Sequence, residues 1–178
     1  MEPSVLYSLV EPTRQLPSEC ASNAVCIAIE KQYALKGIEI DLDEKALDDE
    51  VRKFYGKEER TGVSQIRIFD YIKSNGVRDK KGKRWSIQGW GRSTKHAIKT
   101  YLFERGVVNV SRRSASLRIR KGIATIKSIN ENKSHAVVCF GYDHEEGWLF
   151  VDSSHKTPYY LSDEDFSKLY LGSYYVIV

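Results

Sequence analysis

The sequence predicts an α+β fold, because two hydrophobic periodicities divide the chain. Up to about residue 104, apolar residues recur at helical spacing between capping and stop signals. From Val107 onward the apolar period becomes two, which is typical of strands that bury one face. Helices that precede a largely antiparallel sheet predict a helical N-terminal lobe, a sheet-containing C-terminal lobe and a cleft between them.

The first predicted helix covers residues 20–35, where Ser18 or Glu19 can cap its start and Gly37 ends it. The second follows an Asp-x-x-Glu variant of the capping box at residues 41–44. Further helices are predicted at residues 64–74, 93–104 and 162–169.

The predicted strands are short runs of apolar and β-branched residues. They cover residues 107–110, 123–126, 136–142, 148–152 and 174–178. A hairpin turn at residues 143–147 joins the third strand to the fourth. Residues 80–91 are expected to be irregular or to form a short strand.

Length and composition indicate one globular domain. The 178 residues are 41% hydrophobic and 29% charged, without an internal repeat or a long linker. We therefore expect a single domain over residues 1–178, with a helical lobe at about 18–105 and a β lobe at about 106–178. No run approaches the roughly 18 apolar residues that a membrane span needs, and the first residues lack the pattern of a secretory signal. These observations predict a cytoplasmic protein with no membrane partner.

The net charge of +4 is concentrated in two basic stretches, at residues 78–84 and 112–121. Because no nucleic-acid-binding motif accompanies them, we interpret them as a solvated loop and the outer face of a strand, with an acidic partner as the alternative. Nucleic acid is therefore not an expected partner. Cys26 and Cys139 lie in apolar runs typical of small buried hydrophobes, and few unpaired thiols fit a reducing compartment.

Three residues in chain order carry the chemistry: Cys20, His135 and Asp152. Cys20 opens the first helix, whose N-terminal dipole favours a thiolate. The hairpin at residues 143–147 places His135 beside Asp152, and a carboxylate there fixes the imidazole tautomer and raises its basicity. Each residue alone has an ordinary structural explanation, but together they predict a nucleophile, a base and an orienting acid for acyl transfer.

Gln15, five residues before Cys20, is a candidate oxyanion donor together with the backbone N–H of Cys20. The other histidines, His96, His144 and His155, are interpreted as structural. No His, Cys and Asp spacing suggests a metal site, and no glycine-rich phosphate loop is present. We therefore expect neither a metal nor a cofactor.

The sequence resembles the papain family of cysteine peptidases over nearly its whole length. The most specific match is residues 134–142 (SHAVVCFGY), which are similar to the family's NHAV…VGYG motif. Residues 106–110 resemble its GPVSV strand, and residues 148–153 resemble YWIVKNS. Residues 10–15 resemble the segment that leads to the oxyanion glutamine, and the stretch that includes Gly62 resembles one that lines the substrate cleft.

The resemblance implies a papain-like fold, with an antiparallel β-sheet or barrel in the C-terminal lobe and the active site in the cleft. It implies that Cys20 is the nucleophile, His135 the base, Asp152 the orienting residue and Gln15 the oxyanion donor. It also implies that Gly62, Val63 and Ser134 contact the substrate.

The sequence departs from the family at several of these positions. The third catalytic residue is usually Asn and here is Asp152. Tryptophans of the family are replaced by Ala21 and Ser154, and the second cleft glycine is Val63. The Gln-to-Cys spacing is five instead of six, as in the related bacteriocin-leader peptidases. The family's disulfide cysteines and inhibitory propeptide are absent, which we interpret as the mark of an intracellular enzyme.

The resulting hypothesis is a cysteine peptidase that hydrolyses peptide bonds through a Cys-His-Asp triad and an acyl-enzyme, with a peptide or protein as its partner. The lost tryptophans and Val63 motivate one alternative, a catalytically degenerate papain-like domain that binds peptides. Another alternative keeps the triad but performs deamidation, transamidation or removal of a ubiquitin-like tag. The sequence leaves the oligomeric state open.

Overall fold

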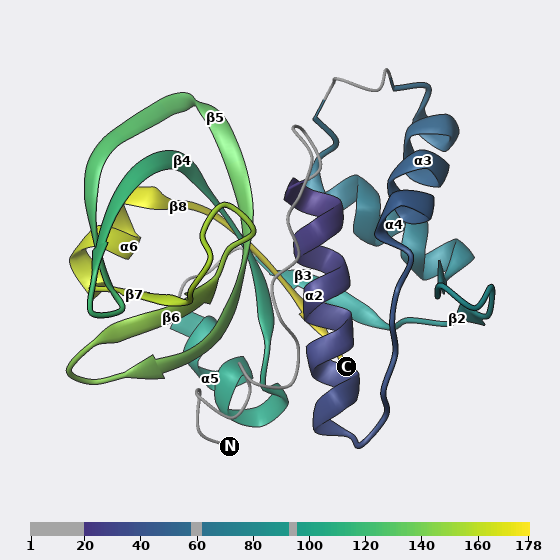
Figure 1. The fold of residues 1–178 in the computed structure, drawn as a ribbon, viewed down its shortest axis with the longest axis horizontal. Coiled ribbons are helices and arrows are strands. Elements are labelled where there is room, and N and C mark those ends of the chain that lie inside the picture. The colour runs from purple at the N-terminus through teal and green to yellow at the C-terminus, as the bar shows by residue number, and fades with distance from the viewer. Residues whose placement is uncertain (1–19, 58–61, 93–95) are drawn as a thin grey trace.

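The computed structural model describes residues 20–57, 62–92 and 96–178, which form five helices and eight strands (Figure 1). The helices are α2 (Cys20–Leu35), α3 (Glu44–Tyr55), α4 (Gln65–Asn75), α5 (His96–Arg105) and α6 (Asp163–Leu169). The strands are β1 (Val77–Arg78), β2 (Arg84–Trp85), β3 (Gly89–Arg92), β4 (Val108–Arg120), β5 (Ile123–Asp143), β6 (Gly147–Val151), β7 (Tyr159–Leu161) and β8 (Tyr170–Ile177). The predicted combination of helices and an antiparallel sheet is confirmed.

Helix α2 lies between the sheet on one side and α3 and α4 on the other (Figure 1). Because neighbours cover it on both sides, residues 21–29 are all buried, including the polar Ser22 and Asn23. This central position explains why its sequence is apolar on nearly every face instead of forming one stripe.

Helix α3 begins later than the capping-box prediction placed it. Asp43 is the N-cap, and its side chain accepts a hydrogen bond from the backbone N–H of Ala46 at 3.0 Å. Asp41, which the prediction placed first in the box, instead forms an exposed ion pair with Lys80 at 2.8 Å. Gly56 ends the helix in the left-handed region at φ 63°, where glycine has no steric penalty.

The main sheet has six strands in the order β3-β8-β4-β5-β6-β7, and neighbouring strands in this order run antiparallel. Strands β4 and β5 are long and strongly curved (Figure 1), and β-bulges interrupt their register after Arg113 and after Ser116. Strand β7 also makes one parallel pairing with the start of β5, Ile123 with Tyr160, but within the described residues β3 and β7 do not pair with each other. The barrel that the resemblance allowed is therefore not closed.

The strand predictions differ from the structure in extent and in number. Strand β4 continues to Arg120 and β8 begins at Tyr170, so both are longer than the predicted runs, and β1 was not predicted. The runs at 123–126 and 136–142 belong to one strand, β5. Partly buried Ile126 and Ile129 lie between them, and the register shift that leaves Lys127 without a partner in β4 lets both pack against the same cluster although they are three residues apart. Strand β7 was not predicted, because its three residues are too few to show a period of two.

The sheet buries both of its faces, so the molecule has two hydrophobic clusters. Alternate residues of β5 separate between them: Val138 joins the cluster that includes α2, α3 and α4, whereas Val137 joins the cluster that includes α6 and Ile98 of α5. Helix α5 therefore packs with the sheet. The division into lobes at residues 105 and 106 stays a prediction.

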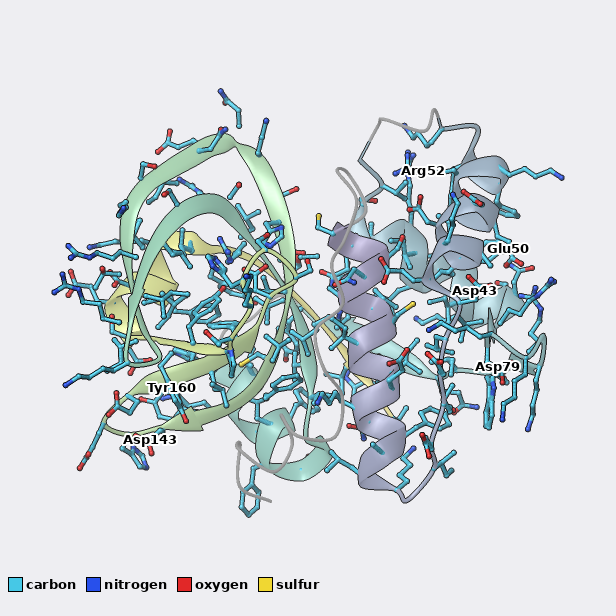
Figure 2. The ribbon with its side chains drawn as sticks, viewed as in Figure 1. Asp43, Glu50, Arg52, Asp79, Asp143 and Tyr160 are labelled. Carbon is cyan, nitrogen blue, oxygen red and sulfur yellow. The ribbon has the colours of Figure 1, made fainter. Side chains whose placement is uncertain are left out.

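The two basic stretches have different surroundings. The first forms the turn between β1 and β2, where the Asp79 carboxylate accepts hydrogen bonds from the backbone N–H groups of Lys81 and Lys83 while both side chains remain exposed. Figure 2 shows Asp79 at this edge of the molecule, on the side of the helices. The second stretch differs from its interpretation as an outer face, because its first residue, Arg112, is buried.

Candidate active site

Cys20 is the first residue of α2, at the end of the helix that lies close to β5 (Figure 1). Its thiol forms hydrogen bonds with the His135 side chain and the backbone of Ala136. Burial by itself raises the pKa of the thiol, but these hydrogen bonds and the charge of His135 outweigh it, so the pKa of Cys20 lies below its ordinary value. The helix N-terminus thus presents an acidified thiol to an imidazole.

His135 lies in β5, opposite Arg112 of β4. Its Nε2 is 2.7 Å from Oδ1 of Asp152, and Oγ of Ser154 lies 3.3 Å from the same nitrogen. With Nε2 occupied in this way, Nδ1 is the ring nitrogen left for Cys20. Burial alone lowers the pKa of His135, but the hydrogen bonds to Asp152 and Cys20 raise it to about 9.

Asp152 follows the last residue of β6 and is almost completely buried. Its Oδ1 accepts the bond with His135 and one from the backbone N–H of Ser154 at 2.9 Å. Its Oδ2 accepts from Nη2 of Arg112 at 2.9 Å and from the hydroxyl of Tyr159 at 2.8 Å. Although burial disfavours the charged form, His135 and Arg112 hold the pKa of Asp152 well below its usual range. The carboxylate therefore stays ionised.

The hairpin between β5 and β6 brings His135 and Asp152 together with a shifted register. Val138 pairs with Val151, so continuation of the ladder places Asp152 opposite Val137 instead of His135. The bulge between Cys139 and Gly141 accounts for a further shift of one residue toward the turn. The two side chains meet diagonally across the strands, a geometry that side-chain reach permits.

The remaining predicted site residues have different environments. Gln15 lies outside the described residues. Gly62 and Ser134 are exposed, and Ser134 directly precedes His135 in β5. Val63 is instead buried in the cluster that includes α2 and α4. Substrate contact by these residues stays a prediction.

The other two cysteines have pKa values shifted in the opposite direction from that of Cys20. Cys26 and Cys139 are fully buried, and burial raises the pKa of each thiol, that of Cys139 to about 12. Both therefore remain protonated and inaccessible, as their apolar surroundings in the sequence indicated.

Sequence reasoning missed two residues that bind Asp152, namely Arg112 and Tyr159. A signal for Arg112 was present, because Val108, Val110 and Arg112 alternate along β4 and all three are buried. The neighbouring basic residues concealed this alternation. Tyr159 had no such signal, since β7 is too short.

Neither a metal site nor a membrane-spanning helix occurs among the described residues. Among residues 20–57, 62–92 and 96–178, no three His, Cys, Asp or Glu side chains are grouped as a metal site requires. None of the helices in these ranges has the length and apolar character to cross a membrane.

No protein-family model matches the sequence, and no curated protein matches it either. The structure, in contrast, is similar to xylellain, a cysteine protease from Xylella fastidiosa, with a TM-score of 0.72 at 15% identity, over 99% of this chain and 88% of xylellain. It is also similar to digestive procathepsin L 3 from the larval midgut of Tenebrio molitor, with a TM-score of 0.64 at 15% identity, over 94% of this chain and 67% of that protein. The chain therefore has a papain-like fold.

Proposed function

We propose that this protein is a cysteine peptidase that cleaves peptide bonds with Cys20, His135 and Asp152. The observation that carries the proposal is the chain of hydrogen bonds from the Cys20 thiol to His135 and from His135 Nε2 to Asp152, the last of 2.7 Å. A lowered thiol pKa beside a raised imidazole pKa favours a thiolate–imidazolium pair. The fold shared with the cysteine protease xylellain supports the same activity.

In the proposed mechanism, the Cys20 thiolate attacks the carbonyl carbon of the peptide, and the carbonyl electron pair moves to oxygen. The backbone N–H of Cys20 and the carboxamide of Gln15 stabilise this oxyanion. His135 donates its proton to the leaving amine as the C–N bond breaks, which leaves an acyl-enzyme. Water then gives a proton to His135 and attacks the acyl carbon, and cleavage of the C–S bond releases a carboxylic acid and restores the thiolate.

The proposed substrate is an extended peptide or protein segment that passes Ser134 and Gly62. Ser134 is exposed beside His135, and among the described residues no heavy atom beyond the chain neighbours of Gly62 lies within 4 Å of the position that a Cβ on Gly62 would take. Both positions thus offer space for a substrate backbone. The cytoplasm is the proposed location, since the three free cysteines fit a reducing compartment.

Alkylation of the native protein by iodoacetamide at mildly acidic pH tests the nucleophile. We expect modification at Cys20 alone, because Cys26 and Cys139 are buried and protonated, and they serve as internal controls. His135→Ala should greatly reduce the rate, because the imidazolium that stabilises the thiolate is lost. Equal labelling of all three thiols, or a rate unaffected by His135→Ala, would contradict the proposal.

Incubation with a diverse peptide library, followed by mass spectrometry, tests the reaction. Proteolysis gives two fragments for each substrate, and Cys20→Ala should give none. A product heavier by about one dalton would indicate deamidation, and joined peptides would indicate transamidation. Binding without any product would favour the degenerate peptide-binding domain and overturn the proposal.

A further inference from the structure

Asp152 adds a buried negative charge to the proposed active site. A thiolate on Cys20 and an imidazolium on His135 together carry no net charge. Asp152, only 1% exposed, adds a full negative charge beside them. An isolated buried charge is unfavourable by many kcal/mol unless it is paired, so this carboxylate requires a compensating group.

The position of Arg112 makes it the group that compensates the charge of Asp152. Arg112 is also only 1% exposed, and its Nη2 donates to Oδ2 of Asp152 at 2.9 Å, while Nη1 donates to the backbone carbonyl of Arg113 at 2.8 Å. The pairing of β4 with β5 places Arg112 directly opposite His135. The guanidinium is therefore held from the backbone and joined to His135 through one shared carboxylate.

Tyr159 completes the set of groups around the carboxylate. Its hydroxyl is fully buried and donates to Oδ2 at 2.8 Å, and Nη2 of Arg112 lies 3.4 Å from the same hydroxyl. Burial raises the pKa of Tyr159 well above its ordinary value, so the hydroxyl keeps its proton and remains a donor. With Oδ2 occupied twice, Oδ1 is directed toward His135.

Stability alone does not explain a buried arginine at this position. Desolvation offsets most of the Coulomb attraction of a buried ion pair, and well-packed apolar residues are often at least as stabilising. Among the residues that the structure describes, the Nε of Arg112 also has no hydrogen-bond partner, which is a further cost. An effect of Arg112 on Asp152 and His135 accounts for the arrangement better.

We propose that Arg112 is a positioning residue whose guanidinium balances the charge of Asp152 and fixes its Oδ1 against His135, so that the four charges of the active site sum to zero. The inference rests on the proposed function, because it assigns Cys20 and His135 to a catalytic ion pair. In this proposal Arg112 makes no contact with the substrate, and it acts through its hydrogen bond to Asp152 and through its charge at His135.

The charged and titratable groups around His135 come from four segments. Cys20 of α2, Arg112 of β4, and Asp152 and His155 after β6 act on it directly, whereas Tyr159 of β7 binds Asp152 and Arg112. Asp152 and Cys20 favour the imidazolium, whereas the charge of Arg112 opposes it. Burial lowers the pKa of His155, and the charges of Arg112 and His135 lower it further, so His155 stays largely neutral at neutral pH. Loss of Arg112 alone should therefore raise the pKa of His135.

The test compares Arg112→Met, Asp152→Asn and the double variant, with two readouts. The first is the NMR titration of the His135 imidazole, which requires no turnover. For Arg112→Met we expect the titration to move upward by about one pH unit, the effect of a nearby charge. The second is peptide cleavage, which should fall about tenfold or more in either single variant and recover in the double variant, where both charges are removed together.

Arg112→Lys is the conservative control. It keeps the charge but cannot bind the Asp152 carboxylate and the backbone carbonyl of Arg113 with two separate nitrogens. It should leave the His135 titration near that of the unmodified protein and lower cleavage less than Arg112→Met does. If Arg112→Met does not fold, Arg112→Lys and the double variant carry the test, since the double variant should fold.

Two results separate this inference from the proposed function. Peptide cleavage together with an unchanged His135 titration in Arg112→Met, or a double variant no better than Arg112→Met, would overturn the charge balance and leave the peptidase intact. A His135 titration that shifts as expected in a protein that cleaves no peptide would retain the charge balance and overturn the peptidase.

Discussion

Two aspartate–arginine pairs are buried among the described residues, and they differ in what surrounds them. Asp48 and Arg52 lie one turn apart in α3, with Oδ2 of Asp48 2.6 Å from Nε of Arg52, and Ser22 of α2 donates to Oδ1 of the same carboxylate at 2.9 Å. Figure 2 shows Arg52 on the side of the helices, across α2 from the sheet. Asp152 and Arg112 lie on different strands, and their carboxylate also binds His135.

The comparison shows that one chemical pair can serve two purposes. In the helical part, the bonds of Asp48 join α3 to α2, and none of Cys20, His135 and Asp152 takes part in them. In the sheet, the bonds of Asp152 reach a titratable ring that contacts Cys20. Variants of the first pair should therefore change stability, and variants of the second should change activity and its pH dependence.

The largest effect is expected from Asp152→Ala. It removes the orienting acid from His135 and leaves Arg112 buried without its partner. Cleavage should fall by about 10⁴-fold, as when the aspartate of a serine-protease triad is replaced. Steady-state kinetics with a cleaved peptide measures the loss, and circular dichroism checks the fold. A folded variant with activity within tenfold of the starting protein would show that Asp152 does not orient His135.

Asp48→Ala should act on stability instead. It takes away the carboxylate that binds both Arg52 and Ser22, so the free energy of unfolding should fall by about 3–5 kcal/mol. Urea denaturation measures the change, and activity per folded molecule should remain nearly unchanged. Asp49→Ala is the matched control on the same helix, because its pair with Lys45 is exposed at 3.4 Å and should contribute less than about 1 kcal/mol.

The interaction between His135 and Asp152 should also make the free energy of unfolding depend on pH. His135 has its pKa raised to about 9, so its contribution is fully present below its ordinary pKa of 6.5 and is lost as the pH rises through 9. Asp152 has its pKa depressed, so its contribution is present above the ordinary aspartate pKa of about 3.9 and is lost as the pH falls below it. Thermal unfolding across this range should show both losses. In Asp152→Asn both losses of stability should be smaller. A pH profile identical to that of the unmodified protein would show that His135 and Asp152 do not couple stability to pH.

The smallest effect is expected from Ser22→Ala, which removes one hydrogen bond to Asp48 and leaves the ion pair in place. The free energy of unfolding should fall by about 1 kcal/mol. Tyr159→Phe removes the equivalent hydroxyl from Asp152 and provides the comparison, because it should also lower the rate of peptide cleavage. If the two variants behaved alike in both assays, the distinction between the pairs would not hold.

Much of the fold was predictable from local patterns. The periodicities located the helices and most strands, and SHAVVCFGY together with Cys20 identified the residues that the structure brings together. Register and extent were not predictable, because bulges in β4 and β5 and the length of β5 depend on packing against α2 and α6. The roles of Cys20, His135, Asp152 and Gln15 stay predictions until the variants are measured.

The sequence by itself determined the α+β class and the residue types available for chemistry, since hydrophobic period and capping are local properties. Only the tertiary structure decided that Arg112, which lies within a basic stretch, is buried against Asp152, forty residues away. The physical reason is that burial and charge pairing depend on which strands become neighbours. A local pattern of charges does not specify that choice.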